Sequence, residues 1–332
     1  MSQYPLNPYP FGWFFAAYAD DLPPGTAQPL VLHARHFVLW RDDEGTPHVS
    51  DAYCAHLGAH LGYGGRVNGV TIRCPFHAWT YDGQGRCVDI PYSNHRLPGR
   101  TALTTYPVAE RNGMVWVWWH PLNDSPTFAV PAVPEWDDPL WTDTYVRQDW
   151  RVRTQWREIA ENGIDLTHFH YLHGVLTIPK LTFVSTDGPL WHSMASFEVR
   201  TPAGPQPSRF EVQFHGPGFG WLRFHIDDVA EILFLITLTP IDGDRVDLRF
   251  SFLSRRPVPQ DHPDFAPALI QEVIDQVTDD VPIWEHKIIK DPPLLAKGDG
   301  PIITFRQWAA QFSVWPTGTA LQHMGRMEVD EA

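Results

Sequence analysis

The chain has 332 residues, of which 43% are hydrophobic and 19% are charged, so it can bury the core of one large or two ordinary domains. Lys and Arg number 25 against 39 Asp and Glu, and this net charge of −14 argues against nucleic acid or an anionic membrane as partner. Three cysteines, an N-terminus without a positively charged leader and no apolar run of about 20 residues predict a cytoplasmic protein without a membrane span.

Short strands separated by turns are predicted in the first part of the chain. The turns DDEG (42–45) and DGQG (82–85) each separate two β-rich runs. The Asn-Gly pair at 112–113 opens MVWVWW, a strand of alternating Val and Trp. We expect a small antiparallel β domain within residues 1–124, with its core at about 30–120.

A second domain is predicted for residues 125–332, beginning with a proline-rich linker or extended arm at 125–139. Residues 150–174 are compatible with a helix and rich in histidine. Strand-like runs follow between residues 197 and 254, and an amphipathic helix is predicted for 267–289. Antiparallel strands followed by a helix make this domain, and the fold class, α+β.

Two close Cys/His pairs mark the first candidate site. They read Cys54-x-His56 and Cys74-x-x-His77. Zinc knuckles usually pair like residues, whereas here each loop offers one Cys and one His. Such mixed loops suit a Rieske centre, in which two His replace two Cys on one of two irons. Cys87 is left over, and we interpret it as a small buried residue.

The segment ENGIDLTHFHYLHG (161–174) is the second candidate site. Two neutral imidazoles and a carboxylate can hold a non-haem iron and leave positions open for O2. Asp165 and His168 share a helix face. His168 and His173 are five residues apart, which an ideal helix separates by about 140°. The helix must therefore distort or end between them if both bind, and spacing alone favours His170 with His173.

A third, distant ligand is expected on the C-terminal helix, which offers Asp279 and Asp280. Asp280 lies beside the apolar stripe of that helix, and a carboxylate there needs a partner such as a metal. Asp279 is predicted to project with Glu272, Asp275 and Gln276 on a solvated face. We therefore favour Asp280 over Asp279 as the ligand.

Both candidate sites resemble known motifs. C-A-H-L-G-x-x-L and C-P-F-H-x-W resemble the Rieske family, with Ala78 where that family usually has Gly. Ala59 and Phe76 stand where disulfide-braced Rieske subunits have cysteines, so the resemblance is to the oxygenase and ferredoxin type. The spacing N-x-x-D-x-x-H-x4-H, from Asn162 to His173, resembles the signature of Rieske non-haem iron oxygenases.

The resemblance implies a role for each motif residue. The protein would fold into an N-terminal Rieske domain and a helix-grip-like catalytic domain with a curved antiparallel sheet and helices. Asp165 would bridge the mononuclear site and His77 of a neighbouring subunit, and Asn162 would support the iron ligands. The implied ligands are, for the [2Fe–2S] cluster, Cys54, His56, Cys74 and His77, and, for a mononuclear Fe(II), His168, His173 and Asp280.

The resemblance runs from GWFFAAYADDLPPG (12–25) to IIKDPPLLAKGDGPIITFRQWAAQF (288–312). That last segment and the form NG-x-D-x-x-H-x-x-Y-L-H (162–173) are most similar to the 3-ketosteroid 9α-hydroxylase and cholesterol 7-desaturase branch. The resemblance implies a homotrimer that hydroxylates or desaturates a steroid-like substrate with O2. Electrons would come from a ferredoxin or a flavin/iron–sulfur reductase, and from NAD(P)H only indirectly. The alternatives are a tailoring oxygenase or aromatic-ring hydroxylase with another substrate, and, outside enzymes, an electron-transfer iron–sulfur protein.

Overall fold

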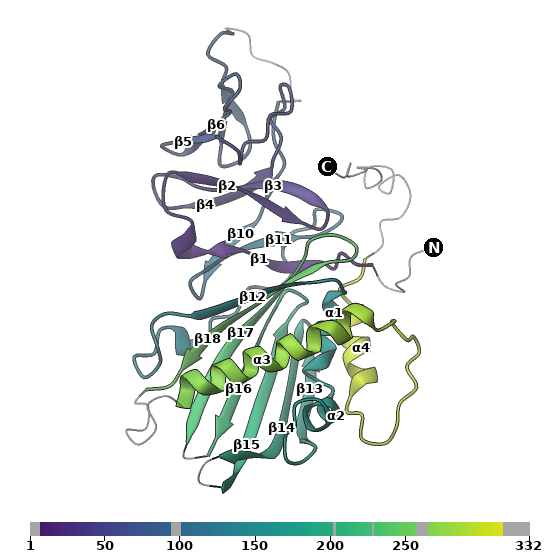
Figure 1. The fold of residues 1–332 in the computed structure, drawn as a ribbon. Helices are drawn as coiled ribbons and strands as arrows, with labels where there is room; N and C mark the ends of the chain where they lie inside the picture. The colour runs from purple at the N-terminus through teal and green to yellow at the C-terminus, as the bar shows by residue number, and fades with distance from the viewer. Residues whose placement is uncertain (1–6, 94–100, 202–203, 228, 257–264, 315–332) are drawn as a thin grey trace.

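The computed structural model describes residues 7–93, 101–201, 204–227, 229–256 and 265–314. The first six residues, part of the N-terminus interpreted as leaderless, lie outside the described residues. Small sheets form one end of the molecule, and a large sheet with its helices forms the other (Figure 1). None of the described helices is long and apolar enough to cross a membrane.

Three small antiparallel sheets build the N-terminal part. The sheet nearest the large sheet consists of β1 (Gly12–Tyr18), β11 (Met114–Trp119) and β10 (Val108–Arg111). The next consists of β2 (Thr26–Leu32), β3 (Arg35–Arg41), β4 (Pro47–Asp51) and β9 (Thr105–Tyr106). The outermost consists of β5 (Arg66–Asn68), β6 (Thr71–Arg73), β7 (Thr80–Asp82) and β8 (Cys87–Asp89). Two short 3-10 helices lie at Ala19–Asp21 and Pro134–Trp136.

The predicted turns connect these strands. DDEG joins β3 to β4, and DGQG joins β7 to β8. Asn112 and Gly113 both have positive φ, at 57° and 68°, as a two-residue hairpin turn of primed type requires between β10 and β11. The small antiparallel β domain is therefore confirmed, while its boundary at residue 124 stays a prediction.

A seven-stranded antiparallel sheet dominates the C-terminal part, in the order β12-β18-β17-β16-β15-β14-β13. The predicted runs between 197 and 254 fall on its last five strands in chain order. The strands of the sheet are β12 (Val146–Val152), β13 (Lys180–Asp187), β14 (Leu190–Thr201), β15 (Gly204–His215), β16 (Phe219–Ile226), β17 (Ala230–Pro240) and β18 (Val246–Ser254).

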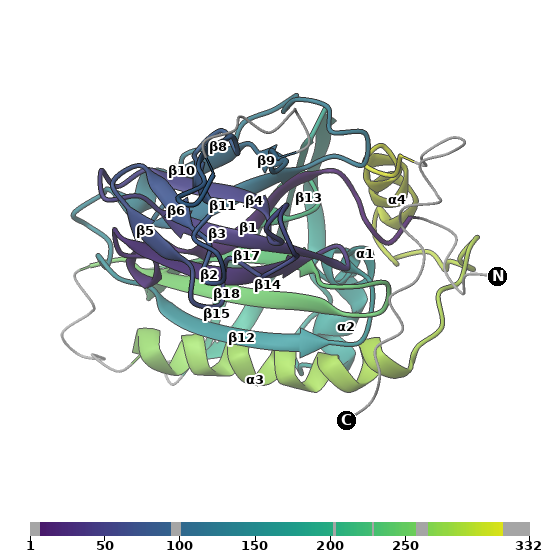
Figure 2. The ribbon, with the colours of Figure 1, turned by 90° about the horizontal axis from the view of Figure 1, so that it is seen from above.

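Helices cover one face of this sheet, and the N-terminal sheets lie on the other, as Figure 2 shows from above. The predicted amphipathic helix is α3 (Phe265–His286). The predicted helical segment 150–174 is only partly right, because residues 150–152 belong to β12 and the rest forms two helices. These are α1 (Trp156–Asn162) and α2 (Leu166–Tyr171), and a further helix, α4 (Ile302–Ala310), follows α3.

The two parts of the molecule share an aromatic core. Trp13 and Trp118 of the N-terminal sheet belong to the same buried cluster as Phe219 and Leu235 of the large sheet. At a second contact, the turn between β2 and β3 donates two backbone N–H groups, from His33 and Ala34, to the carbonyls of Pro240 and Ile241 at the end of β17. The central strands β17 and β18 of the large sheet are therefore buried on both faces, and its outer strands extend beyond the N-terminal sheets (Figure 1).

Candidate metal centres

The two Cys/His loops lie at the tip of the molecule, beside the outermost small sheet. In one loop the Cys54 N–H donates to the Ala59 carbonyl (2.9 Å), and in the other the Cys74 N–H donates to the Trp79 carbonyl (2.8 Å). Both cysteines are buried, and the rings of His56 and His77 are 4.8 Å apart. Two similar turns therefore bring all four predicted ligands together.

The four side chains suit a two-iron cluster better than a zinc ion. A single zinc with ligands at about 2.0–2.3 Å would hold any two ligand atoms within about 4.6 Å of each other. Among the described residues, no three of Cys54, His56, Cys74 and His77 bring their ligand atoms within 4.8 Å. The Nδ1 atoms of His56 and His77 are buried, and they have no hydrogen-bond partner among the residues that the structure describes. Such nitrogens are costly to bury unless a metal binds them.

Tyr81 contacts this site, although the sequence analysis missed it. Its hydroxyl lies 3.1 Å from Cys54 Sγ and accepts the Ala55 N–H at 3.2 Å. Burial raises the pKa of Tyr81, so the phenol keeps its proton and donates it toward the sulfur. Nothing in the local spacing marks Tyr81, because its reach depends on where β7 places it.

Ala78, the one departure from the Rieske pattern, has a φ of +62°. An L-residue is strained in this left-handed region, whereas glycine is not. The preference for Gly at this position is thus a backbone requirement that Ala78 meets at some cost.

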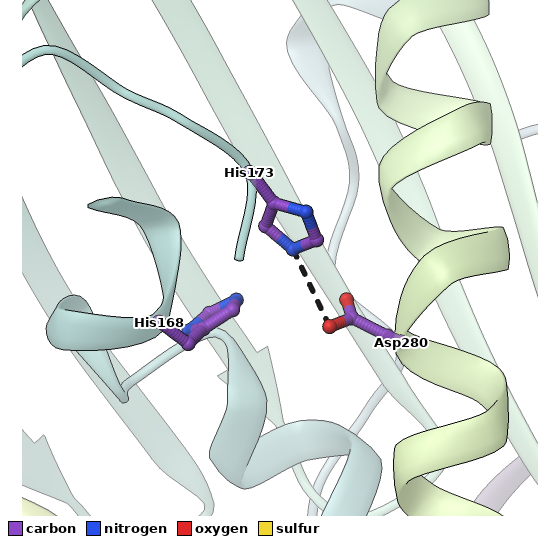
Figure 3. Close-up of side chains that lie close together, drawn as sticks. All are labelled: His168, His173 and Asp280. Atoms are coloured by element: carbon purple, nitrogen blue, oxygen red, sulfur yellow. Dashed lines mark ion pairs between the residues drawn. The ribbon is translucent and has the colours of Figure 1, made fainter. Parts of the chain in front are cut away.

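The second candidate centre joins α2 and α3. The ligand atoms of His168, His173 and Asp280 all lie within 4.8 Å of one another. His173 Nε2 is 3.3 Å from Asp280 Oδ1 (Figure 3). The side chains of His173 and Asp280 are 1% and 6% exposed, so the carboxylate is removed from water.

Helix α2 ends at Tyr171, between the two histidines, as their five-residue separation requires. His173 lies beyond the helix end and can turn toward His168, and the two rings are 5.1 Å apart. His170 instead directs its Nδ1 to the Val175 carbonyl (2.6 Å). The pairing of His170 with His173 that spacing alone favours is therefore wrong.

Asn162 holds the group together from the end of α1. Its Nδ2 donates to Asp280 Oδ2 (2.9 Å) and lies 3.1 Å from His168 Nε2. His168 Nδ1 donates to the backbone carbonyl of Asp165 (2.5 Å), which orients the ring. Burial lowers the pKa of His168, so the imidazole is neutral at pH 7 with its lone pair on Nε2.

His173 completes the fit to a metal. Both of its ring nitrogens are buried and lack a hydrogen-bond partner in the described structure. Two imidazoles beside one carboxylate form the donor set that divalent iron takes in non-haem oxygenases. The residues present therefore suit a mononuclear iron.

Buried ion pairs anchor the helix that carries Asn162. Glu158 contacts Lys287 Nζ at 2.8 Å, just beyond the end of α3. Glu161 accepts two hydrogen bonds from Arg306 of α4, at 2.5 and 2.7 Å. These contacts connect α1 to the segment just after α3 and to α4. The sequence analysis did not identify them.

Asp165 has a structural role besides the predicted one. It is the N-cap of α2, and its carboxylate accepts the Thr167 N–H at 3.1 Å. Its backbone carbonyl, not its side chain, contacts His168. The carboxylate is thus placed at the helix end next to the triad.

The faces of α3 differ in part from the sequence-based expectation. Asp280 is buried and Asp279 is exposed, as predicted, and Asp275 is also exposed. Glu272 is exposed, as predicted, whereas Gln276 is half-buried, and both border a cavity between α3 and the sheet. The prediction failed for Gln276 because the curved sheet leaves space under this polar edge of the helix.

That cavity has a volume of about 480 Å³ and is bounded by the triad and the large sheet. Its walls are mostly apolar, with Phe197, Phe210, Phe224 and Phe250 from four strands. The size lies within the range of about 300–1,000 Å³ that small-molecule sites occupy. A substrate in it would lie directly beside His168, His173 and Asp280.

A Rieske-type tip and a mononuclear iron site under a long helix define the class of the protein as a Rieske non-haem iron oxygenase. Solved members have the same fold. The structure of Pseudomonas putida CBB5 NdmA with caffeine matches with a TM-score of 0.75 and 18% identity, over 90% of this chain and 89% of that one. Dicamba monooxygenase bound to dicamba matches with a TM-score of 0.73 and 17% identity, over 92% and 98%.

Sequence comparison identifies the branch. The Rieske [2Fe-2S] domain family matches residues 12–107, and the 3-ketosteroid 9α-hydroxylase C-terminal domain family matches residues 117–313. A cholesterol 7-desaturase of Xenopus laevis is 32% identical, over 92% of this chain and 72% of the relative. A probable 3-ketosteroid-9-alpha-monooxygenase oxygenase component of Rhodococcus rhodochrous is 31% identical, over 93% and 81%. The chain belongs to this family of Rieske oxygenases, whose cofactors are a [2Fe–2S] cluster and a mononuclear iron.

Proposed function

We propose that this chain hydroxylates or desaturates a C–H bond of a steroid or sterol. The observation that carries the proposal is the apolar cavity of about 480 Å³, which opens onto the predicted iron ligands. The two relatives described above are named for cholesterol and for a 3-ketosteroid. An apolar wall orients such a molecule by shape and excludes water from the reacting centre.

Within this proposal, Cys54, His56, Cys74 and His77 hold the cluster, and His168, His173 and Asp280 hold the iron. When bound, the cluster supplies single electrons and the iron activates O2. The chain's own residues position these groups. Tyr81 donates a hydrogen bond to a cluster sulfur ligand. Asn162 fixes two iron ligands relative to each other.

A homotrimer is part of the proposal, because the tip and the triad lie at opposite ends of one chain (Figure 1). Head-to-tail packing would place Asp165 beside His77 of a neighbouring subunit. Charge supports this arrangement. Residues 52–81, which include both cluster loops, contain no Asp or Glu, although the chain as a whole has a net charge of −14, so the tip can pack against an acidic surface of a neighbouring subunit. Arg66 and Arg73 face each other across β5 and β6, and both are exposed. Like charges in that position are unfavourable unless a partner neutralises them.

Exposed apolar side chains accompany both proposed surfaces. Leu57, Tyr63 and Phe76 surround the cluster loops and are 65%, 68% and 62% exposed. Tyr171, at the end of α2 and two residues before His173, is 76% exposed. Apolar surface of this kind typically marks a protein interface.

The electron donor is a reductase, as for an oxygenase component, and we propose a ferredoxin or a flavin/iron–sulfur reductase that draws on NAD(P)H. A cytoplasmic location also belongs to the proposal. None of the three cysteines, all of them among the described residues, forms a disulfide, which is typical of a reducing compartment.

Reconstitution with a surrogate reductase tests this function. The purified protein should show the visible spectrum of a Rieske cluster and contain about three irons per chain, two in the cluster and one in the triad. A panel of steroids and sterols, incubated with O2 and NADH, should yield a hydroxylated or desaturated product. Two irons per chain would indicate electron transfer alone. Turnover of small aromatic substrates but of no steroid would favour a ring hydroxylase or tailoring oxygenase.

A further inference from the structure

A row of polar side chains crosses the otherwise apolar cavity wall formed by α3. Glu272, Gln276 and Asp280 all line the cavity and are spaced four residues apart. Such residues lie on one face of a helix. With a rise of 1.5 Å per residue, Gln276 lies about 6 Å and Glu272 about 12 Å along the axis from Asp280. The row therefore offers polar contacts to a bound molecule along the α3 side of the cavity.

The hydrogen bond within the row fixes the orientation of Gln276. Its Nε2 donates to Glu272 Oε1 at 3.2 Å. A carboxylate only accepts hydrogen bonds, so the amide must turn its NH2 group to Glu272. The carbonyl oxygen, Oε1, is then the free end of Gln276. Gln276 is half-buried, whereas Glu272 is exposed, so Gln276 is the deeper of the two.

The other polar groups of the cavity do not supply an equivalent contact. Asn162 lies beside the iron ligands, and its NH2 group already donates to Asp280. Arg200 also borders the cavity, but it is exposed near the end of β14. Gln276, half-buried at the solvent-exposed edge of the α3 wall, thus offers the cavity an acceptor one helical turn from Asp280.

We infer that the substrate carries a hydroxyl group, which donates a hydrogen bond to Gln276 Oε1 while the apolar skeleton extends to the iron site. This inference rests on the proposed function and narrows its substrate class from steroids in general to hydroxylated ones. A ketone in the same position would place two acceptors against each other and leave Gln276 unpaired. Glu272 acts as a positioning residue, because it sets which end of the amide faces the substrate.

A matched ligand pair tests the inference, with 5α-cholestan-3β-ol and 5α-cholestan-3-one as probes. Their skeletons are the same, and only the hydroxyl and ketone differ. Binding to the fully loaded protein is measured by quenching of tryptophan fluorescence. The alcohol should bind about tenfold more tightly than the ketone, the worth of one hydrogen bond. Gln276→Met should weaken alcohol binding about tenfold and leave ketone binding unchanged.

The same helix offers a matched control. Gln271 donates to Asp275 at 2.8 Å in a similar amide–carboxylate pair four residues apart, with the order of the two residues reversed, and neither residue lines the cavity. Gln271→Met should leave both affinities unchanged. Glu272→Gln removes the charge that holds the amide of Gln276, so the ketone should gain affinity and the preference for the alcohol should shrink.

The outcomes separate this inference from the proposed function. Equal binding of both probes to the wild type, or an unchanged preference in Gln276→Met, would overturn the inference and leave the steroid proposal standing. Tighter ketone binding that Arg200→Met abolishes would also overturn it and assign recognition to Arg200. Failure of both probes to bind, with no steroid converted, would refute the proposed function and the inference together.

Discussion

The cluster loops and the iron triad position their metal ligands in opposite ways. The four ligands at the tip lie between residues 54 and 77, on two turns closed by short backbone hydrogen bonds. The triad draws on α2 and α3, and its organising residue, Asn162, is 118 positions from Asp280 in the chain. The first site is local in sequence and exposed around its rim. The second depends on the whole domain and is buried.

This difference follows from what each site has to do. A tip that exchanges electrons with partner proteins needs an accessible edge, so local turns are sufficient to hold it. A site that activates O2 beside a C–H bond needs exclusion of water. Burial of Asp280 among apolar side chains is costly unless the carboxylate is bonded, and Asn162 and His173 provide contacts. The following changes test how independent the two sites are.

Removal of the carboxylate ligand should have the largest effect. Asp280→Ala should release the mononuclear iron and abolish turnover, because even partners outside the ligand shell are worth about 10–100-fold in metal affinity. The visible spectrum of the cluster should stay, and the iron content should fall from about three to about two per chain. Asp279→Ala, one residue away on the exposed face, is the control and should change neither. Loss of the cluster in Asp280→Ala would show that the sites are not independent.

Asp165 tests the proposed connection between the sites. Asn is as good an N-cap as Asp, so Asp165→Asn should keep α2 intact while it removes the charge. We expect both metals to stay bound and steady-state turnover to fall by about 10–100-fold, the range for groups that support a metal ligand. Iron analysis and product formation measure the two effects. Normal turnover in this variant would exclude Asp165 from electron transfer between subunits.

The tip was the more predictable site, because its chemistry is local. The spacing of two Cys and two His is enough to indicate the cluster, and turn residues indicate the strands around it. The contact of Tyr81 with the cluster loop was not predicted, because its hydrogen bond to sulfur depends on how β7 packs. At the triad, helix geometry required a helix end before His173 only if His168 and His173 both bind, and it was the resemblance that selected this pair over His170 and His173. The burial of Asp280 followed from the apolar stripe of α3.

The rest of the triad region required the fold. Periodicity assigned Gln276 to solvent, although it is half-buried and borders the cavity, because the curvature of the sheet away from that edge of α3 is not visible in the sequence pattern. Strand β13 is exposed at every residue and offers no alternation of apolar and polar positions. Strand β12 is also largely exposed, so its last residues were assigned to the following helix. The ion pairs that anchor α1 join segments far apart in the chain.

His33 lies where the N-terminal sheets contact the large sheet, and it should make the free energy of unfolding pH-dependent. Its buried ring packs against Phe14 and Trp119, and both ring nitrogens lack a hydrogen-bond partner within the described ranges. Burial lowers the pKa of His33 well below its usual value of 6.5. The unfolded chain therefore takes up this proton as the pH falls below about 6.5, while the folded chain does not.

The free energy of unfolding should consequently decrease below pH 6.5, by up to about 1.4 kcal/mol per pH unit from this residue. Above pH 6.5 the contribution should be flat. Denaturant unfolding at several pH values measures the slope, and His33→Phe should reduce it. An unchanged slope in the variant would mean that other groups set the acid sensitivity.

Tyr81 should tune the tip without affecting the triad. A hydrogen bond to a cluster ligand favours the more negative, reduced state of the cluster. Tyr81→Phe should therefore lower the reduction potential, on the order of 50 mV for a bond worth about 1 kcal/mol. A redox titration followed by visible absorption measures the shift. The control, Tyr53→Phe, changes a half-exposed tyrosine near the same loop and should leave the potential unchanged.

The smallest effect is expected at Ala78, where the chain departs from the Rieske pattern. Ala78 has a left-handed φ of +62°, which costs an alanine about 1–2 kcal/mol. Replacement by glycine removes this cost, but the greater freedom of glycine in the unfolded chain takes back about 0.5–1 kcal/mol of the stabilisation. Ala78→Gly should thus stabilise the tip by up to about 1 kcal/mol, seen as slower loss of the cluster absorbance in denaturant. Ala59→Gly is the control, because Ala59 is not among the residues with positive φ and should lose stability instead. Because the tip is held by local turns, the triad should bind iron equally well in both variants, and a change there would mean that strain at the tip reaches the buried site.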